Sequence, residues 1–211
     1  MYLFASCCHG FSVYRIKIYN IFNFYYLRWE KIYYYGYLNR FIMETGAKLY
    51  SFGYTNLKTY LVTFLFVAGN IVFPLLCHMI PNGGIILLPI YFFTLVAAYK
   101  YGLKVGLLTA MLSPLVNSFC FGMPAVSVLP IILIKSGLLA VAAAYIARYS
   151  GKISWVGILA AVLFYQIIGT AIEWMIVKDF FVAVQDFRMG IPGMLIQIFA
   201  GYAVLKAIAR I

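Results

Sequence analysis

The chain has 211 residues, of which 65% are hydrophobic and 10% are charged, and its formal net charge is +11. A soluble domain carries about 25% charged residues, so this chain has too little polar surface to cover a globule in water. Together with a mean hydropathy of +0.97, this indicates an all-α integral membrane protein. The positive charge does not favour nucleic-acid binding, because most basic residues lie at the ends of apolar runs, where they set membrane topology.

Residues 1–58 form a basic N-terminal segment with more than half of the 19 tyrosines and nearly half of the 16 Lys and Arg residues. The run between Lys17 and Arg28 has 10 residues, about half of the ~20 that a spanning helix needs. Two interpretations stay open. Either the segment is disordered or lies on the membrane surface, or it precedes a true start at Met43. We favour the later start, which a peptide from residues 1–40 of the mature protein would refute.

The membrane domain, residues 59–211, contains six apolar segments that predict a six-transmembrane-helix bundle. They cover residues 59–80, 85–101, 102–121, 131–149, 153–177 and 190–209. Most have close to the ~20 residues that cross a bilayer, and glycine and proline mark the breaks between them. Pro89 interrupts the second segment, which a helix in lipid tolerates when neighbouring groups satisfy the freed carbonyl.

Basic residues gather at one end of the six predicted helices. They are Lys48, Lys58, Lys100, Lys104, Arg148, Lys152, Lys206 and Arg210. The charges at the other end cancel; they belong to Lys178, Arg188, Asp179 and Asp186. Because loops rich in Lys and Arg stay in the cytoplasm, we expect both termini there and the protein in the cell (inner) membrane.

Polar side chains fall in the outer half of the predicted bundle. Lys135 lies five residues inside the fourth helix and Glu173 lies five residues from the outer end of the fifth, so both sit about 7.5 Å deep. At ~4 Å and an effective dielectric of about 20, their attraction of about 4 kcal/mol would offset part of the ~3 kcal/mol that each charge costs in the membrane. The candidate substrate-binding residues are Lys135, Glu173, Asn117, His78, Gln166, Thr170, Gln197 and Asn82.

Purely structural interpretations of these polar residues stay open beside the functional one. The Lys135 ammonium could reach the outer surface along its long stem, form a purely structural ion pair with Glu173, or contact a ligand. A single amide such as Gln197 more often makes a hydrogen bond between helices, and His78 more often lies at the interface. Convergence of several polar groups favours a shared chamber, since ionisable groups in membranes normally face a bundle interior or a wet cavity.

Small residues repeat every four positions on one face of the third helix and one face of the fourth. These residues are Gly102, Gly106, Ala110, Ser136, Ala140 and Ala144. Such faces let two backbones approach closely. They predict either packing inside the bundle or docking of a partner subunit, and both interpretations stay open.

Motifs for catalysis and metal binding are absent from the sequence. There is no GxxxxGK[ST], HExxH or GxSxG, and the four cysteines show no metal-ligand spacing. Cys77 and Cys120 are most simply small core residues, although a disulfide between them stays open. We therefore expect no catalytic residue, metal or cofactor in this chain.

The segment YKYGLKVGLLTAMLSPLVNSFCFGMPAVSVLP, residues 99–130, resembles the S components of energy-coupling factor (ECF) vitamin transporters. The shared features are a short basic turn, the helix with Gly102 and Gly106, the pair Ser113-Pro114, and the loop from Gly122-Met123-Pro124 to Pro130. Six helices and inward termini also fit, and the resemblance covers roughly residues 55–209.

The resemblance implies a subunit that binds one vitamin or related micronutrient from outside the cell. It further implies a membrane scaffold subunit and two ATPase subunits as partners, which use the ATP and drive the reorientation that releases the substrate inside. Many family members carry an Ala-x-x-x-Ala docking face on helix 1. Here Ala68 is followed by Val72, so the docking surface stays open.

Two other classes of function stay open. An intramembrane enzyme acting on lipid-linked groups would have only His78 and Glu173 as candidates, and turnover of a lipid substrate would reveal it. A structural subunit of a membrane complex would bind no ligand and would co-purify with partners. The vitamin itself stays open, although Lys135 and Glu173 at the mouth would suit a zwitterionic or carboxylate-bearing molecule.

Overall fold

The computed structural model describes residues 45–46, 49–50, 54, 56–79, 81 and 83–209, which belong to one compact unit. Most of the basic N-terminal segment, with the expected start at Met43, lies outside the described residues. The interpretations of that segment therefore stay predictions.

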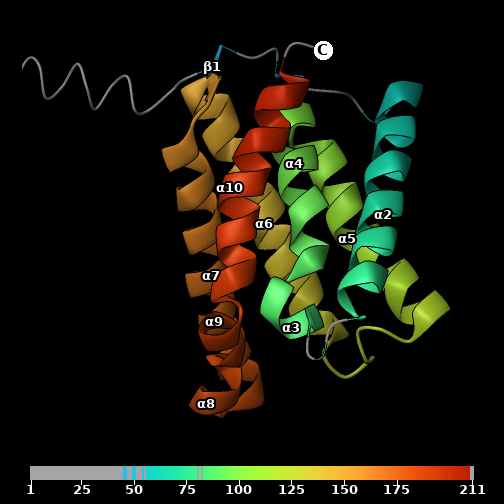
Figure 1. The fold of residues 1–211 in the computed structure, drawn as a ribbon, viewed down its shortest axis with the longest axis vertical. Helices are drawn as coiled ribbons and strands as arrows, with labels where there is room; N and C mark the ends of the chain where they lie inside the picture. Colours follow the sequence, from blue (N-terminus) through green and yellow to red (C-terminus); the bar gives the residue numbers. More distant parts are fainter. Residues whose placement is uncertain are drawn as a thin grey trace, which may run out of the picture. The chain divides into compact units, whose positions relative to one another are not determined.

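Within the described residues, six helical spans are long and apolar enough to cross a membrane, and they pack side by side in a bundle (Figure 1). The elements in chain order are β1 (Thr45–Gly46), α2 (Leu57–Cys77), α3 (Gly83–Leu87), the 3-10 turn η1 (Pro89–Tyr91), α4 (Phe92–Tyr101), α5 (Leu103–Phe121), α6 (Leu129–Ser150), β2 (Lys152–Ile153), α7 (Trp155–Val177), α8 (Phe180–Ala183), α9 (Gln185–Met189) and α10 (Ile191–Ile208). The predicted all-α, six-helix membrane bundle is confirmed, and the chain is a multi-pass membrane protein.

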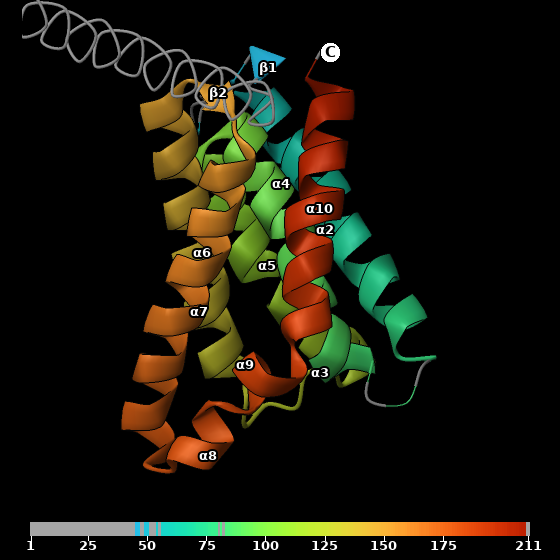
Figure 2. The ribbon, with the colours of Figure 1, turned by 60° about the vertical axis from the view of Figure 1, so that its left-hand side comes forward.

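The connections lie at two ends of the bundle (Figure 2). The antiparallel pair of β1 and β2 lies at one end, which we call the basic end because the described basic residues of the predicted cytoplasmic loops lie there. The short helices α8 and α9 lie at the other end, which we call the α9 end (Figure 1). Each span therefore runs from one of these ends to the other.

Helix boundaries follow local capping chemistry. The Asn56 side chain accepts the backbone N–H of Lys58 at 3.1 Å where α2 begins, and Ser154 caps α7 in the same way. The helices α5 and α6 end at Gly122 and Gly151, with φ of 67° and 64°. Glycine adopts this left-handed conformation without a Cβ clash, so these ends are set locally.

The second span, Gly83–Tyr101, is broken in the middle. A proline disfavours helical conformation in the residue before it, and Leu88, which precedes Pro89, has φ 46° and ψ 47°. The chain turns through η1 and resumes as α4. The Leu88 carbonyl at the break accepts hydrogen bonds from the Tyr91 N–H at 3.3 Å and from Gln197 Nε2 of α10 at 3.4 Å, so a neighbouring helix binds the backbone at the interruption.

Pro74 creates a second polar junction, inside α2. A proline lacks the N–H that would bind the carbonyl four residues earlier, which here belongs to Asn70. Asn117 of α5 donates its Nδ2 to that carbonyl at 2.8 Å. The Asn70 amide in turn donates to the hydroxyls of Thr94 and Ser113, both at 3.1 Å. These bonds tie α2, α4 and α5 together in the bundle interior.

The two faces of small residues pack inside the bundle. A Cβ added to Gly106 would lie 2.5 Å from the Cβ of Ala98 on α4. The other helical members of the two faces are buried: Ala110, Ser136, Ala140 and Ala144. Gly102 separates α4 from α5 with φ 87°. Internal packing is thus the interpretation that the structure supports for these two faces.

The two cysteines of the membrane domain are free thiols. Cys77 is buried at the end of α2, as expected of a core residue. Cys120 is exposed, so its predicted core position is wrong; it lies on the outward face of the last turn of α5. No disulfide joins them.

Candidate functional site

A cavity of about 400 Å³ lies at the α9 end of the bundle. Its wall is built by α2, α3, η1, the loop after α5, and parts of α6 to α9. Most of the lining is apolar, and the polar and aromatic groups in it are His78, Tyr91, Glu173, Gln185 and Asp186. Pockets of about 300–1,000 Å³ with few polar groups are typical of sites for small molecules.

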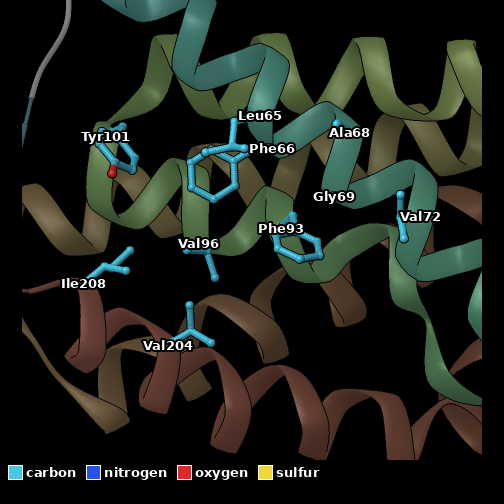
Figure 3. Close-up of a pocket in the computed structure, with 10 residues that line it drawn as sticks. All are labelled: Leu65, Phe66, Ala68, Gly69, Val72, Phe93, Val96, Tyr101, Val204 and Ile208. Atoms are coloured by element: carbon cyan, nitrogen blue, oxygen red, sulfur yellow. The ribbon is translucent and has the colours of Figure 1, made fainter.

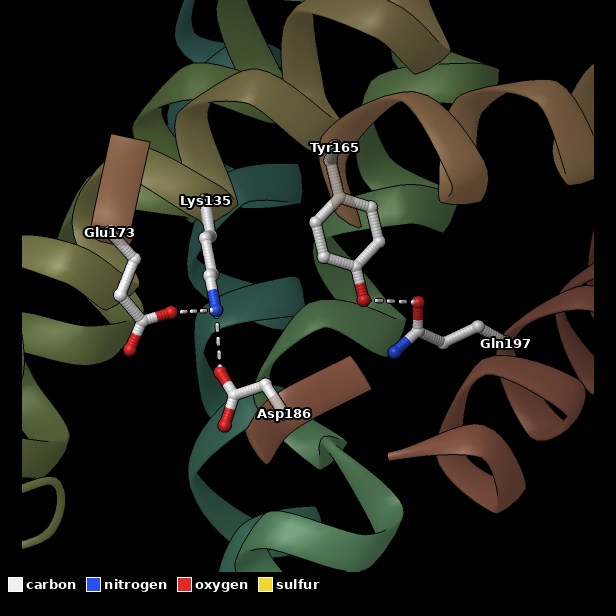
Figure 4. A network of polar contacts seen from close by, with 5 residues as sticks. All are labelled: Lys135, Tyr165, Glu173, Asp186 and Gln197. Atoms are coloured by element: carbon white, nitrogen blue, oxygen red, sulfur yellow. Dashed lines mark hydrogen bonds and ion pairs between the residues drawn. The ribbon is translucent and has the colours of Figure 1, made fainter. Parts of the chain in front are cut away.

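Lys135 is fully buried behind this cavity. Its Nζ lies 2.5 Å from Glu173 Oε2 on α7 and 2.7 Å from Asp186 Oδ2 on α9, and Figure 4 shows the ammonium between the two carboxylates. The Lys135–Glu173 pair predicted from equal depth is confirmed. The interpretation in which Lys135 reaches the surface is wrong, because its side chain is only 1% exposed.

Glycine makes room for the lysine stem. A Cβ added to Gly169 would lie 2.7 Å from Lys135 Cγ, so the stem crosses α7 over a position without a side chain. Glu173 is four residues further along α7, on the same helical face. The backbone of α7 therefore guides the ammonium towards the carboxylate.

The third member of the cluster, Asp186, was not singled out in the sequence. It lies in the short connection between α7 and α10, where its charge was expected only to offset nearby basic residues. The signal was its position 13 residues after Glu173, in a connection that has to fold back over the same bundle end. Gly190 permits this fold, because a Cβ there would lie 2.5 Å from Leu88 Cδ1.

The cluster presents negative charge to the cavity. Glu173 and Asp186 line the wall, and Lys135 does not. Each carboxylate forms its ion pair with Lys135 Nζ through one oxygen. The other two oxygens, Glu173 Oε1 and Asp186 Oδ1, make no ion pair among the described residues. When both carboxylates are ionised, the two carboxylates and one ammonium carry a net charge of −1, so the site can accept hydrogen bonds and stabilise positive charge.

Tyrosines form the aromatic side of the site and were also missed in the sequence. Tyr91 of η1 is 3% exposed and lines the cavity, and its ring centroid lies 5.1 Å from that of Tyr165. The Tyr165 hydroxyl donates to Gln197 Oε1 at 3.1 Å (Figure 4). Since Gln197 also donates to the Leu88 carbonyl, this chain of contacts holds the broken span in place.

The remaining candidates divide between wall, scaffold and interior. His78 is exposed and lines the cavity, whereas Asn117 and Gln197 make the interhelical hydrogen bonds described above and do not line it. The Gln166 amide and the Thr170 hydroxyl have no hydrogen-bond partner within the described residues, and neither residue lines the cavity. Asn82 lies outside the described residues, so its role stays a prediction.

A second hollow, of about 450 Å³, lies on the flank of the bundle. Figure 3 shows it between α2, α4 and α10, with apolar side chains and Tyr101 as its lining. Ala68 and Val72, where the docking motif was sought, belong to it. With no charged group to orient a ligand, this hollow suits lipid chains or an apolar helix better than a polar solute.

The feature that stands out is a buried charge cluster beside a cavity at one end of a membrane bundle. Comparison of the chain with protein-family models, with curated proteins and with solved structures gave no match.

Proposed function

We propose that the chain is the substrate-binding subunit of an ECF-type importer in the cell (inner) membrane. In this proposal both termini are cytoplasmic, the α9 end faces outside, and the cavity captures a vitamin or related micronutrient. A scaffold subunit and two ATPases, as separate chains, then drive release inside. The observation that carries the proposal is the cavity of about 400 Å³ with Glu173 and Asp186 in its wall.

The energetics of the charge cluster support a role beyond structure. Transfer of charges from water into a protein interior costs several kcal/mol per ion, and an apolar replacement is often as stable. A bundle that only needed packing would gain little from Lys135 and its two partners. Ionisable groups at this position in a membrane protein are by default candidates for a functional site.

The broken second span supports the same site. Transporters commonly form substrate sites where a discontinuous helix exposes backbone and side chains to a cavity. Here the break at Leu88 and Pro89 lies in the cavity wall, together with Tyr91 just after it. The interruption and the charge cluster therefore face one chamber.

Bound-ligand mass spectrometry tests the proposal. The chain is purified gently from cells, and the small molecules released on denaturation are compared with those from the Glu173→Gln and Asp186→Asn variants. We expect one micronutrient-sized compound, near one per chain, that binds with micromolar or better affinity and is depleted in both variants. Asp179→Asn is the control, because Asp179 lies in the same connection but does not line the cavity.

A second measurement separates the importer from its alternatives. Co-expression with a scaffold and ATPase pair from the same genome should give ATP-dependent uptake of the compound. Stable co-purification with membrane partners and no bound compound would instead favour a structural subunit, and turnover of a lipid substrate by the isolated chain would favour an enzyme.

A further inference from the structure

We infer that the ligand of this cavity carries a positively charged group, such as a protonated amine or a quaternary nitrogen, on an apolar or aromatic body. The inference rests on the proposed function and names the ligand class of its site. It narrows the expectation of a zwitterionic or carboxylate-bearing molecule to one with a positive group, because Lys135 lies behind the cavity wall and the two carboxylates line it.

The position of the Lys135 ammonium determines which sign of charge the ligand can carry. Lys135 lies behind the wall, with its Nζ already held by Glu173 at 2.5 Å and by Asp186 at 2.7 Å. An anionic ligand would have to displace a carboxylate from this ammonium and leave that carboxylate unpaired in a buried setting, which is costly. A cation needs no such exchange, since it adds a second counter-ion to a cluster with one negative charge in excess.

The rest of the wall is suited to the same ligand. No Lys or Arg is among the described residues that line the cavity, and His78 is the lining side chain that can become cationic by taking up a proton. Tyr91 contributes an aromatic ring, and cations bind ring faces with about 0.5–2 kcal/mol. Apolar residues from η1 and α6, such as Ile90, Ile131 and Ile132, supply the surface for an uncharged body.

Charged thiol reagents test the sign of the electrostatic potential in the cavity, even though the ligand is not known. The full chain is prepared with its native cysteines replaced (C7S, C8S, C77A, C120S) and with Ile85→Cys, because Ile85 lines the cavity and is 38% exposed. A second protein keeps Cys120, which is exposed, as its single thiol. Both proteins react in neutral detergent with trimethylammonium-ethyl and with sulfonatoethyl methanethiosulfonate, which differ in charge.

The readout is the ratio of the rate constants of the cationic and the anionic reagent at the same thiol. The fraction of thiolate is the same for both reagents, so it cancels in this ratio. We expect the cation-to-anion ratio at residue 85 to exceed the ratio at Cys120 by about five- to tenfold, as one unit of charge at ~8 Å would give in a partly aqueous site. Glu173→Gln and Asp186→Asn should each bring the ratio close to that of Cys120. Asp179→Asn should leave it unchanged, because asparagine also caps α8.

The other outcomes overturn different parts of the inference. Equal ratios at residue 85 and Cys120, or a preference for the anion, would reject the cationic ligand and leave a small-molecule site in place. No reaction at residue 85 with either reagent would show that solutes do not enter, which rejects the proposed function as well. Each substitution is also made in the protein that keeps Cys120 as its single thiol. If its elution volume and the reactivity of Cys120 are unchanged, misfolding is excluded as the cause.

Discussion

Lys135 brings an ammonium group into a helix that is otherwise suited to lipid. Its two carboxylate partners come from α7 and α9, so the charge is balanced by elements that are distant from α6 in the sequence. Removal of one partner from a buried ion pair typically costs about 3–5 kcal/mol, because the remaining charge is left uncompensated. The residue therefore links the packing of three elements to the charge of the cavity.

Lys135→Met should destabilise the protein by about 3–5 kcal/mol, because it leaves Glu173 and Asp186 facing each other without a counter-charge. Addition of Glu173→Gln and Asp186→Asn should restore much of that loss. Thermal unfolding of the detergent-solubilised variants, followed by size-exclusion chromatography, measures both steps. A triple variant no more stable than Lys135→Met would contradict the electrostatic account.

Gly169→Ala should destabilise by about 1–3 kcal/mol, since the added Cβ would overlap the Lys135 stem at 2.7 Å. Gly137→Ala is the matched control in another span, because its nearest neighbour at 3.1 Å is the flexible end of Met111. We expect a clearly smaller loss for the control in the same unfolding assay. Equal losses would mean that the lysine stem does not cross α7 at Gly169.

At the scale of elements, proline sets where polar contacts have to form. Pro74 opens a gap in the hydrogen bonds of α2 that the Asn117 amide fills, and at the break before Pro89 the Gln197 amide binds the Leu88 carbonyl. Both amides were candidate substrate-binding residues, with an interhelical hydrogen bond as the open alternative for Gln197. The sequence could not decide between these uses, because it does not tell which helix faces the backbone next to a proline.

Asn117→Ala should cost about 1–3 kcal/mol, because it leaves the Asn70 carbonyl without its donor at 2.8 Å. The loss should shrink in a Pro74→Ala background, where the backbone N–H of residue 74 can bind that carbonyl. A double-mutant cycle on unfolding free energies measures this coupling. Additive losses would show that Asn117 does not act through the freed carbonyl.

At the scale of the whole molecule, hydropathy and the distribution of basic residues were sufficient to predict the six spans. Depth arithmetic also paired Lys135 with Glu173. Asp186 and Tyr91 were missed, because the role of Asp186 depends on how the connection after α7 folds back over the bundle, and that of Tyr91 on a helix break that turns its ring inward. The outward position of Cys120 was missed for a similar reason: hydropathy does not separate outward-facing from core-facing positions near the end of a span.

The proposed orientation predicts opposite labelling of the two ends. In intact cells, the membrane-impermeant sulfonatoethyl reagent should modify Cys120, which is exposed at the α9 end of α5. A protein with C7S, C8S, C77A, C120S and Tyr149→Cys should react only after the membrane is permeabilised, because Tyr149 is 87% exposed near the basic end. The reverse pattern would place the cavity on the cytoplasmic side.

The broken second span is fastened to α10 at two levels. Near the break, Gln197 donates to the Leu88 carbonyl at 3.4 Å; at the basic end, Lys100 Nζ donates to the Ile208 carbonyl at 2.8 Å. These two hydrogen bonds, one near the break and one at the basic end, restrict rotation of the second span relative to α10. A movement that admits a solute into the cavity would then involve other parts of its wall, such as α2 or the loop after α5, because these two helices are held together.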